Sequence, residues 1–251
     1  MADEEAQPGQ AGPGGPADQE SAGDGRVRPI GLIATFVVAL VLIVGVAAFF
    51  WSETYKSPSG TIVAHPIGTA VVNGQTLPHV SLSFQTYPDS TGSVNGVPIH
   101  PSGNPSWPAY GPSNVYQVPA HALVTVSVRQ YDSGGTLNNP FFATVRGTVG
   151  GTAVFNGKTE TSIDPNNVGH TFTVRGVPGY DPGFFLNVPL PAVPGDNQAD
   201  NGQYESVTFS FVSGSKGTYA WNCEFPCGQM VAGFGGTMGA FGFMSGFIHV
   251  V

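Results

Sequence analysis

The segment Ser206-Val-Thr-Phe-Ser-Phe-Val212 alternates polar residues with Val and Phe, and the segment His121-Ala-Leu-Val-Thr-Val-Ser-Val-Arg129 alternates in a similar way. Alternation of β-branched or aromatic residues with polar ones is typical of a strand that buries one face. Shorter runs of this kind cover 80–86, 171–174 and 247–251. No run with helical periodicity and helix caps lies among them. The pattern predicts an all-β sandwich over residues 61–251.

Glycine and proline separate these runs. The chain of 251 residues contains 36 Gly and 22 Pro, and turn signals such as Asn73-Gly74 and Asn156-Gly157 fall between the predicted strands. The segment 87–115 is rich in Pro, Gly, Ser and Asn, which predicts a long surface loop whose Trp107 and Tyr110 fold it back onto the sandwich. The domain is therefore expected to consist of short strands joined by turns.

Composition and motifs exclude several classes of function. The formal net charge of −8 offers no basic surface to nucleic acid. The glycines between 233 and 246 do not follow a strand into a helix, so they predict no phosphate-binding loop and no nucleotide. Neither a strand-to-helix Gly-x-Ser-x-Gly turn nor a His-Glu-x-x-His motif occurs, which removes the commonest hydrolase sites. Two cysteines are too few for a disulfide framework.

An uncharged run, IGLIATFVVALVLIVGVAAFFW, extends from Ile30 to Trp51. As a helix with a rise of about 1.5 Å per residue it would be about 33 Å long, enough for the roughly 30 Å hydrocarbon core of a bilayer. A cleaved signal peptide is the alternative, but the run is longer than the apolar region of such a peptide. We therefore predict a transmembrane helix over 30–51 that anchors the chain in a lipid bilayer.

The flanks of this run predict its orientation. Residues 1–29 are rich in Gly, Pro and acidic residues, and we expect a disordered acidic tail there. Arg26 and Arg28 place an excess of positive charge before the run, which predicts a cytoplasmic N-terminus. Residues 52–60 are then a linker. The predicted sandwich would lie on the extracytoplasmic side of the cell membrane, where disulfides can persist.

Residue types that bind soft metals gather near the ends of predicted strands. The segment Asn167-Val-Gly-His170 places a histidine at the start of one strand, and Cys223-Glu-Phe-Pro-Cys227 places two cysteines at the end of another. Met244 precedes the last predicted strand. Thiolate and thioether ligands select copper(I), and imidazole suits both oxidation states of copper. These residues form a candidate copper site if the strand topology brings them together.

The order of these features resembles the cupredoxins. A His-x-Phe strand is followed by a Gly-x-Tyr-x-x-x-Cys strand end and by a Met-x-Gly turn into a Val-rich terminal strand. Within that superfamily, Cys223-x-x-x-Cys227-Gly228 is similar to the copper domain of cytochrome c oxidase subunit II, which also follows a membrane anchor. The resemblance covers roughly 115–251 and implies a Greek-key β-sandwich.

The resemblance also implies a ligand set and a role. The implied copper ligands are His170, Cys223, Cys227 and Met244, with the backbone carbonyl of Glu224 and the thioether of Met238 as secondary candidates. The implied role is electron transfer with a redox protein or a respiratory complex. We accordingly expect an electron carrier or an oxidase-associated subunit rather than a stand-alone enzyme.

The sequence departs from the family at one ligand, which leaves alternatives open. The second histidine has no counterpart, because Val231 and Phe241 stand at the two possible alignments. A single copper ion with Met238 or His249 as a replacement ligand is one alternative. A metal-free structural or interaction module, in which the two cysteines form a disulfide, is another. A copper chaperone that uses the Met-rich loop is a third.

Overall fold

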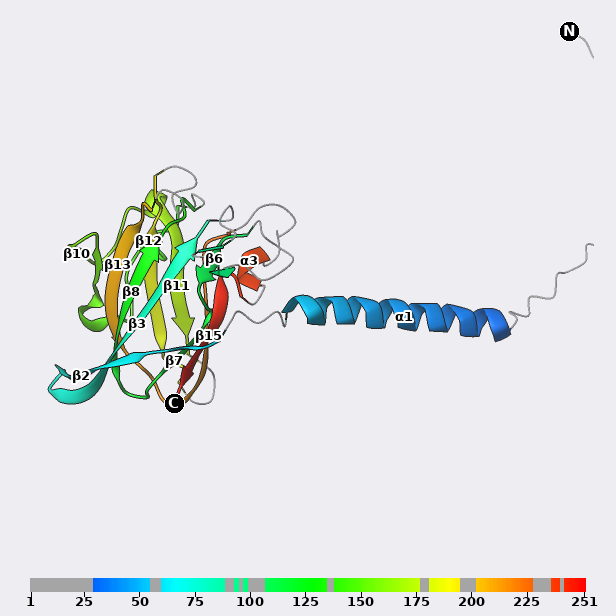
Figure 1. Ribbon diagram of the computed structural model, residues 1–251, viewed down its shortest axis with the longest axis horizontal. Coiled ribbons are helices and arrows are strands. Elements are labelled where there is room, and N and C mark those ends of the chain that lie inside the picture. The colour runs from blue at the N-terminus through cyan, green and yellow to red at the C-terminus, as the bar shows by residue number, and fades with distance from the viewer. Residues whose placement is uncertain are drawn as a thin grey trace, which may run out of the picture. The chain divides into compact units, whose positions relative to one another are not determined.

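The computed structural model describes residues 29–54, 60–88, 93–94, 97–98, 107–134, 138–176, 181–194, 202–227, 236–239 and 242–251. The chain divides into two compact units, Met1–Ala47 and Ala48–Val251, and each is described by itself. Figure 1 shows one long helix and a group of strands that carries the C-terminus.

Helix α1 covers Pro29–Thr54, which includes the segment 30–51 and Ser52–Thr54 of the predicted linker. Among the residues that the structure describes, no helix is both long enough and apolar enough to cross a membrane. The predicted span is therefore not supported by the structure and stays a prediction. The predicted tail, apart from Pro29, and residues 55–59 of the linker lie outside the described residues.

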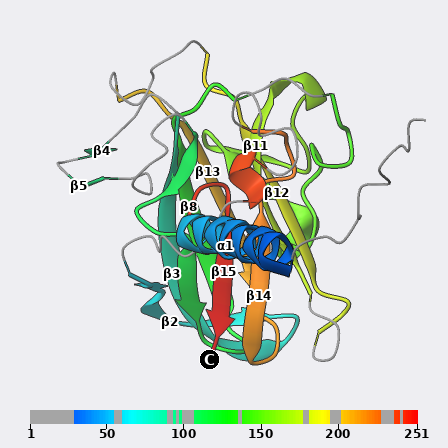
Figure 2. The same ribbon diagram turned by 90° about the vertical axis from the view of Figure 1, so that its right-hand side faces the viewer.

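Two β-sheets build the second unit (Figures 1 and 2). The first sheet has six strands in the order β1 (Ile62–Val63), β7 (Val115–Val118), β15 (Ser245–Val250), β14 (Gly217–Asn222), β11 (Val168–Arg175) and β12 (Phe185–Pro191). The second sheet runs in the order β10 (Lys158–Glu160), β9 (Ala153–Phe155), β13 (Glu205–Val212), β8 (Leu123–Gln130), β3 (Gln75–Tyr87) and β2 (His65–Val72), and β6 (Ala109–Gly111) pairs with β3. A separate pair joins β4 (Ser93–Val94) to β5 (Val97–Pro98), and the short helices are η1 (Val149–Gly151), η2 (Pro165–Asn167) and α3 (Gly236–Gly239).

The chain crosses repeatedly between the two sheets. It leaves β8 and β9 in the second sheet for β11 and β12 in the first, returns to β13 and finishes with β14 and β15. Most neighbours are antiparallel, but β7 runs parallel to both β1 and β15, and β3 runs parallel to β8. Figure 2 shows β14 and β15 side by side in the first sheet. The predicted all-β sandwich is confirmed.

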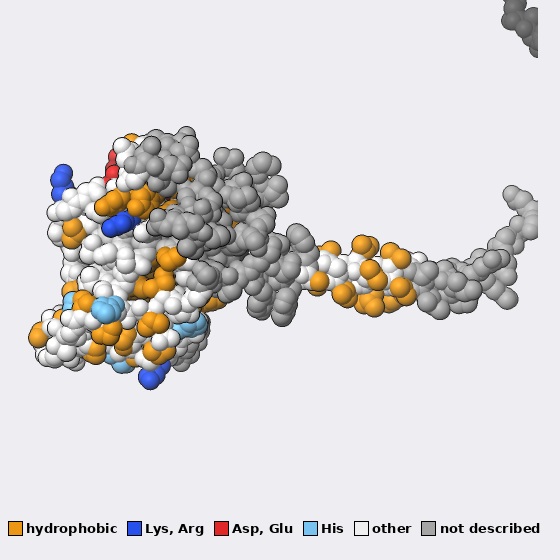
Figure 3. Space-filling model, viewed as in Figure 1, with side chains coloured by type: hydrophobic (Ala, Val, Ile, Leu, Met, Phe, Trp, Pro, Cys, Tyr) orange, Lys and Arg blue, Asp and Glu red, His pale blue; other side chains and the backbone are white. Residues whose placement is uncertain are grey.

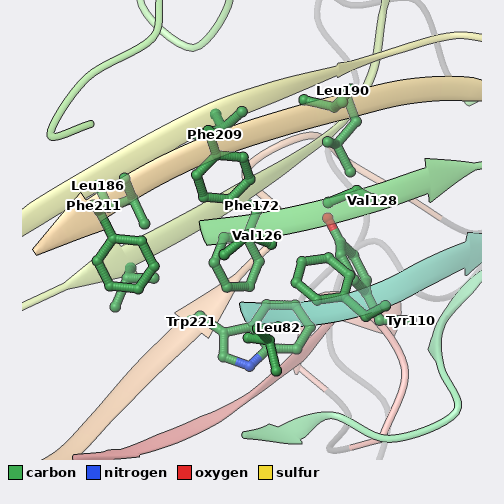
Figure 4. Packing of buried hydrophobic residues seen from close by; sticks show 14 of the residues in the cluster. Leu82, Tyr110, Val126, Val128, Phe172, Leu186, Leu190, Phe209, Phe211 and Trp221 are labelled. Carbon is green, nitrogen blue, oxygen red and sulfur yellow. The ribbon is translucent and has the colours of Figure 1, made fainter. Parts of the chain in front are cut away.

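The core lies between the two sheets and combines aliphatic side chains with a group of aromatic rings (Figure 4). Phe172 on β11 is fully buried, with its ring centroid 5.0 Å from that of Phe84 and 5.2 Å from that of Trp221. Phe209 and Phe211 on β13 reach the core from the other sheet. The alternating residues that predicted the strands therefore supply the packing that joins the layers.

The strands predicted by alternation are all present. The runs at 80–86, 121–129, 171–174, 206–212 and 247–251 fall largely within β3, β8, β11, β13 and β15. Both predicted Asn-Gly turns have positive φ at each residue. The predicted loop 87–115 is only partly described, and its last part contains the short strand β6, in which Tyr110 is fully buried and donates a hydrogen bond to the Thr171 carbonyl oxygen (2.9 Å). That contact ties the segment into the core.

Candidate metal centre

Adjacent strands bring the candidate ligands together. His170 lies on β11, whose residues from Val168 to Val174 are all buried, at a register shift in its pairing with β12. Because β11 pairs with β14, the end of β14 places Cys223 next to the same strand. The Cys223 amide donates a hydrogen bond to the Met244 carbonyl oxygen (2.8 Å), which links the site to the segment before β15.

Three donor atoms converge at this point. His170 Nδ1 lies 3.0 Å from Cys227 Sγ and 3.8 Å from Cys223 Sγ, and the two sulfurs are 3.4 Å apart. The point equidistant from the three atoms lies about 2.0 Å from each, close to the 2.0–2.3 Å typical of metal–nitrogen and metal–sulfur bonds. The three side chains are buried, and their donor atoms form a group in the described part of the chain that could hold a metal ion.

The two cysteines are not joined by a disulfide bond. Their sulfur–sulfur distance of 3.4 Å is much longer than the roughly 2.05 Å of a disulfide bond. Cys223 and Cys227 are each further linked to the Phe225 carbonyl oxygen, at 3.6 Å and 3.1 Å. The structure therefore shows the two cysteines in the reduced form and not as the disulfide of the metal-free alternative.

A carboxylate that sequence reasoning missed completes the cluster. Asp132, two residues after the end of β8, places Oδ2 2.7 Å from His170 Nε2. Nothing in the sequence marked this residue, because it stands 38 positions before the histidine in the segment Asp132-Ser-Gly-Gly135, whose composition is typical of a turn. Their contact depends on how that turn folds against β11.

The charges of these four groups are coupled. Burial opposes protonation of His170, but hydrogen bonds and charge interactions with Asp132 and Cys223 outweigh it and raise the histidine pKa to about 10. Burial also opposes ionisation of Cys223, yet hydrogen bonds from Cys227 and His170 lower its pKa well below the usual value. The hydrogen bond with Cys223 and burial raise the pKa of Cys227. Without metal, the site therefore holds an imidazolium, one thiolate and one thiol.

The same contacts determine the state of the carboxylate. Burial alone would raise the pKa of Asp132, but the hydrogen bond and the charge of His170 lower it, with help from the Ser133 and Gly134 amides. Asp132 is therefore ionised at neutral pH, where it neutralises the imidazolium. A thiolate is the form of cysteine that binds metal, so Cys223 is ready for ligation and Cys227 must first lose a proton.

The two methionines lie close to the cysteines. Met238 Sδ is 3.2 Å from the Cys227 backbone nitrogen, which donates a hydrogen bond to it, and Met238 is half-buried on α3. Met244 is fully buried in the cluster that contains both cysteines. The structure thus brings both predicted thioethers to the region of the site, with the Met238 sulfur directly beside Cys227.

Two other candidates point elsewhere. The Glu224 carboxylate pairs with Arg175 and accepts a hydrogen bond from the Asn222 amide (3.1 Å), so its side chain is engaged away from the thiols. His249 Nδ1 lies 3.0 Å from Thr218 Oγ1, on the neighbouring strand β14. Neither side chain joins the converging group. Val231 and Phe241, the positions of the missing second histidine, lie outside the described residues.

The donor set fits copper. Two thiolate-forming cysteines with an imidazole, and thioethers nearby, are the soft ligands that select copper(I) and tolerate copper(II). Zinc also accepts two cysteines and a histidine. The group of His170, Cys223 and Cys227 supplies three donors among the described residues. The observed residues therefore suit a soft metal such as copper.

Comparison with known proteins gives distant structural similarity. No protein-family model and no curated protein sequence matches the chain. A structure of the copper protein rusticyanin is 15% identical, with a TM-score of 0.35 over 83% of this chain and 94% of that one. Rusticyanin from Thiobacillus ferrooxidans is 17% identical, with a TM-score of 0.33 and coverage of 69% and 82%. Auracyanin B is 16% identical, with a TM-score of 0.30 and coverage of 75% and 99%.

At these values the similarity assigns no function, so the function has to be argued from the residues of the site. The closer resemblance to cytochrome c oxidase subunit II is not shown by these neighbours and stays a prediction.

Proposed function

We propose that the C-terminal β-sandwich is a cupredoxin-like domain that binds copper and transfers electrons. The observation that carries the proposal is the convergence of His170 Nδ1 and the sulfurs of Cys223 and Cys227, all buried and all within 4.8 Å of one another. The three residues come from two separate segments, so their meeting is a property of the fold. Copper would supply a one-electron couple there.

The protein's own contribution is to hold the ligands in place. His170 is fixed by β11 on one side and by Asp132 on the other. Cys223 accepts a hydrogen bond from the Thr171 amide (3.4 Å), and its own amide is bound to the Met244 carbonyl oxygen. A ligand set that is held in this way changes little between oxidation states, and burial keeps water away. Both properties favour fast electron transfer.

Copper titration of the full-length chain under anaerobic conditions tests this function. We expect one copper ion per chain, a thiolate-to-copper absorption band after oxidation, and loss of both in Cys223→Ser and His170→Gln. The matched control is His249→Gln, because His249 is a histidine that bonds to Thr218 outside the site. Absence of bound copper in the purified chain, together with no free thiols after denaturation, would instead support the metal-free module with a Cys223–Cys227 disulfide.

We further propose that the segment 30–51 anchors the chain in the cell membrane, with the sandwich on the extracytoplasmic side. The run has no charged residue, and as a helix of about 33 Å it would be long enough for the hydrocarbon core of a bilayer. Recovery of the full chain in the aqueous fraction after alkaline extraction of membranes would contradict the anchor.

A redox protein or respiratory complex is the proposed partner, as for cytochrome c oxidase subunit II, which the cysteine motif resembles. Charged side chains are sparse on the face of the domain drawn in Figure 3, in agreement with a composition that is only 10% charged. A docking surface with few charges predicts an electron-transfer rate that depends weakly on ionic strength. Stopped-flow reduction by a soluble donor at low and high salt measures that dependence.

A further inference from the structure

The Asp132 carboxylate is buried against the candidate ligand His170. Its Oδ2 lies 2.7 Å from Nε2, and the exposed fractions of the two residues are 8% and 1%. An ionised carboxylate only accepts hydrogen bonds, so Nε2 carries the proton in this contact. The atom left for a metal is Nδ1, and Nδ1 is the atom that lies beside the two sulfurs. The carboxylate thus selects which ring nitrogen faces the thiols.

The turn that carries Asp132 packs closely against β11. The Asp132 carbonyl oxygen accepts hydrogen bonds from the Val193 amide (3.1 Å) and from the Gln130 side chain (3.0 Å). Gly134 has φ +64°, and a Cβ at this position would lie only 2.3 Å from the Gly169 Cα. A side chain at Gly134 would therefore push the turn away from β11. Glycine lets the turn pack directly beside the residue that precedes the histidine.

We propose that Asp132 is a positioning residue for the metal centre: it orients the His170 ring with Nδ1 toward the cysteine sulfurs and places a fixed negative charge behind that ligand. This inference rests on the proposed copper function and adds to it a residue that provides no metal–ligand bond. A carboxylate behind a histidine ligand makes the imidazole a stronger donor and fixes its orientation. The negative charge favours copper(II) over copper(I) and so lowers the reduction potential.

Two substitutions separate orientation from charge. Asp132→Ala removes the acceptor, and we expect copper affinity to fall about 10- to 100-fold. Asp132→Asn keeps an oxygen that can accept a hydrogen bond from Nε2–H but removes the charge, so we expect a smaller loss of affinity together with a more positive reduction potential. The matched control is Asp181→Asn, which loses the same charge but changes a hydrogen bond from the Tyr219 hydroxyl (3.0 Å). The control is expected to change neither quantity.

A measurement on the metal-free chain tests orientation independently of copper. In the wild-type chain and in Asp132→Asn, the Nε2 proton of His170 should give a slowly exchanging imidazole signal in the NMR spectrum. The signal should be lost in Asp132→Ala. If the wild-type chain binds no copper but the signal depends on Asp132, the proposed function fails and the orienting contact stands.

The opposite result overturns the inference. If the wild-type chain binds copper, but Asp132→Ala keeps both the copper affinity and the His170 signal, then Asp132 does not position the ligand. An unchanged reduction potential in Asp132→Asn would remove the proposed effect of charge. If Asp132 had only a structural role, its substitution would lower the stability of the fold. The reduction potential of Asp132→Asn would then equal that of the control Asp181→Asn.

Discussion

Proton release on copper binding is the quantity that most directly tests the electrostatics of the site. At pH 9, a histidine with a pKa of about 10 is about nine-tenths protonated. The raised pKa of Cys227 keeps its thiol protonated at this pH, whereas Cys223 is already a thiolate. Because both the imidazole nitrogen and the thiol must be deprotonated to bind metal, we expect about two protons to be released per copper(I) ion.

Independent ligands with ordinary pKa values would behave differently. At pH 9, a histidine with the ordinary pKa of 6.5 carries almost no proton, and two thiols with the ordinary pKa of 9.0 are each half protonated. Such a site would release about one proton per ion. Anaerobic calorimetric titration with copper(I) in two buffers of different ionisation enthalpy gives the number directly. A release of one proton or fewer at pH 9 would refute the coupled site.

Three further predictions concern stability. Phe172→Ala opens a cavity at the centre of the aromatic core and should lower the free energy of unfolding by about 3–5 kcal/mol in chemical denaturation, while Phe141→Ala, at a side chain 49% exposed, should cost much less. Gly246→Ala would place a Cβ 1.9 Å from a backbone oxygen of the neighbouring segment and should cost about 1–3 kcal/mol by thermal or chemical unfolding, whereas Gly183→Ala meets no atom within 4 Å and should be nearly neutral. In the metal-free chain, wild type should be more stable than His170→Gln below pH 6.5, because folding raises the pKa of His170 to about 10. This difference in the free energy of unfolding should disappear as the pH rises through about 10. A difference in denaturation midpoints that does not change with pH would contradict the prediction.

The strands in which polar and apolar residues alternate could be predicted from the sequence, and those without this alternation could not. In β13 the burial alternates in step with Val207, Phe209 and Phe211, which is the signal that identified the strand. In β12, by contrast, Phe185–Pro191 is buried or half-buried throughout and includes two prolines, so no alternation marks it. The strand β6 has only three residues and owes its place to contacts made by Tyr110. Such strands are determined by their neighbours.

The candidate site likewise contains residues that the sequence predicts and one that it does not. His170, Cys223 and Cys227 were predicted because their residue types are those that bind soft metals, and the topology brings them together. Asp132 was missed because a carboxylate in a turn has many possible roles. Its role depends on a contact between Gly134 and Gly169 that no spacing in the sequence encodes. Residue type predicts direct ligands better than it predicts the groups that orient them.

The protonation of the metal-free site explains how a cluster rich in acidic groups can be buried. Asp132 and Cys223 carry two negative charges, and burying them without a cation would be costly. The proton on His170 supplies that cation, and the proton on Cys227 prevents a third negative charge. Replacing these two protons with one copper(II) ion would leave the net charge of the site unchanged, and replacing them with copper(I) would make it more negative by one unit. The site can therefore stay folded without metal, and the distances among its three donor atoms already approach those that a metal requires.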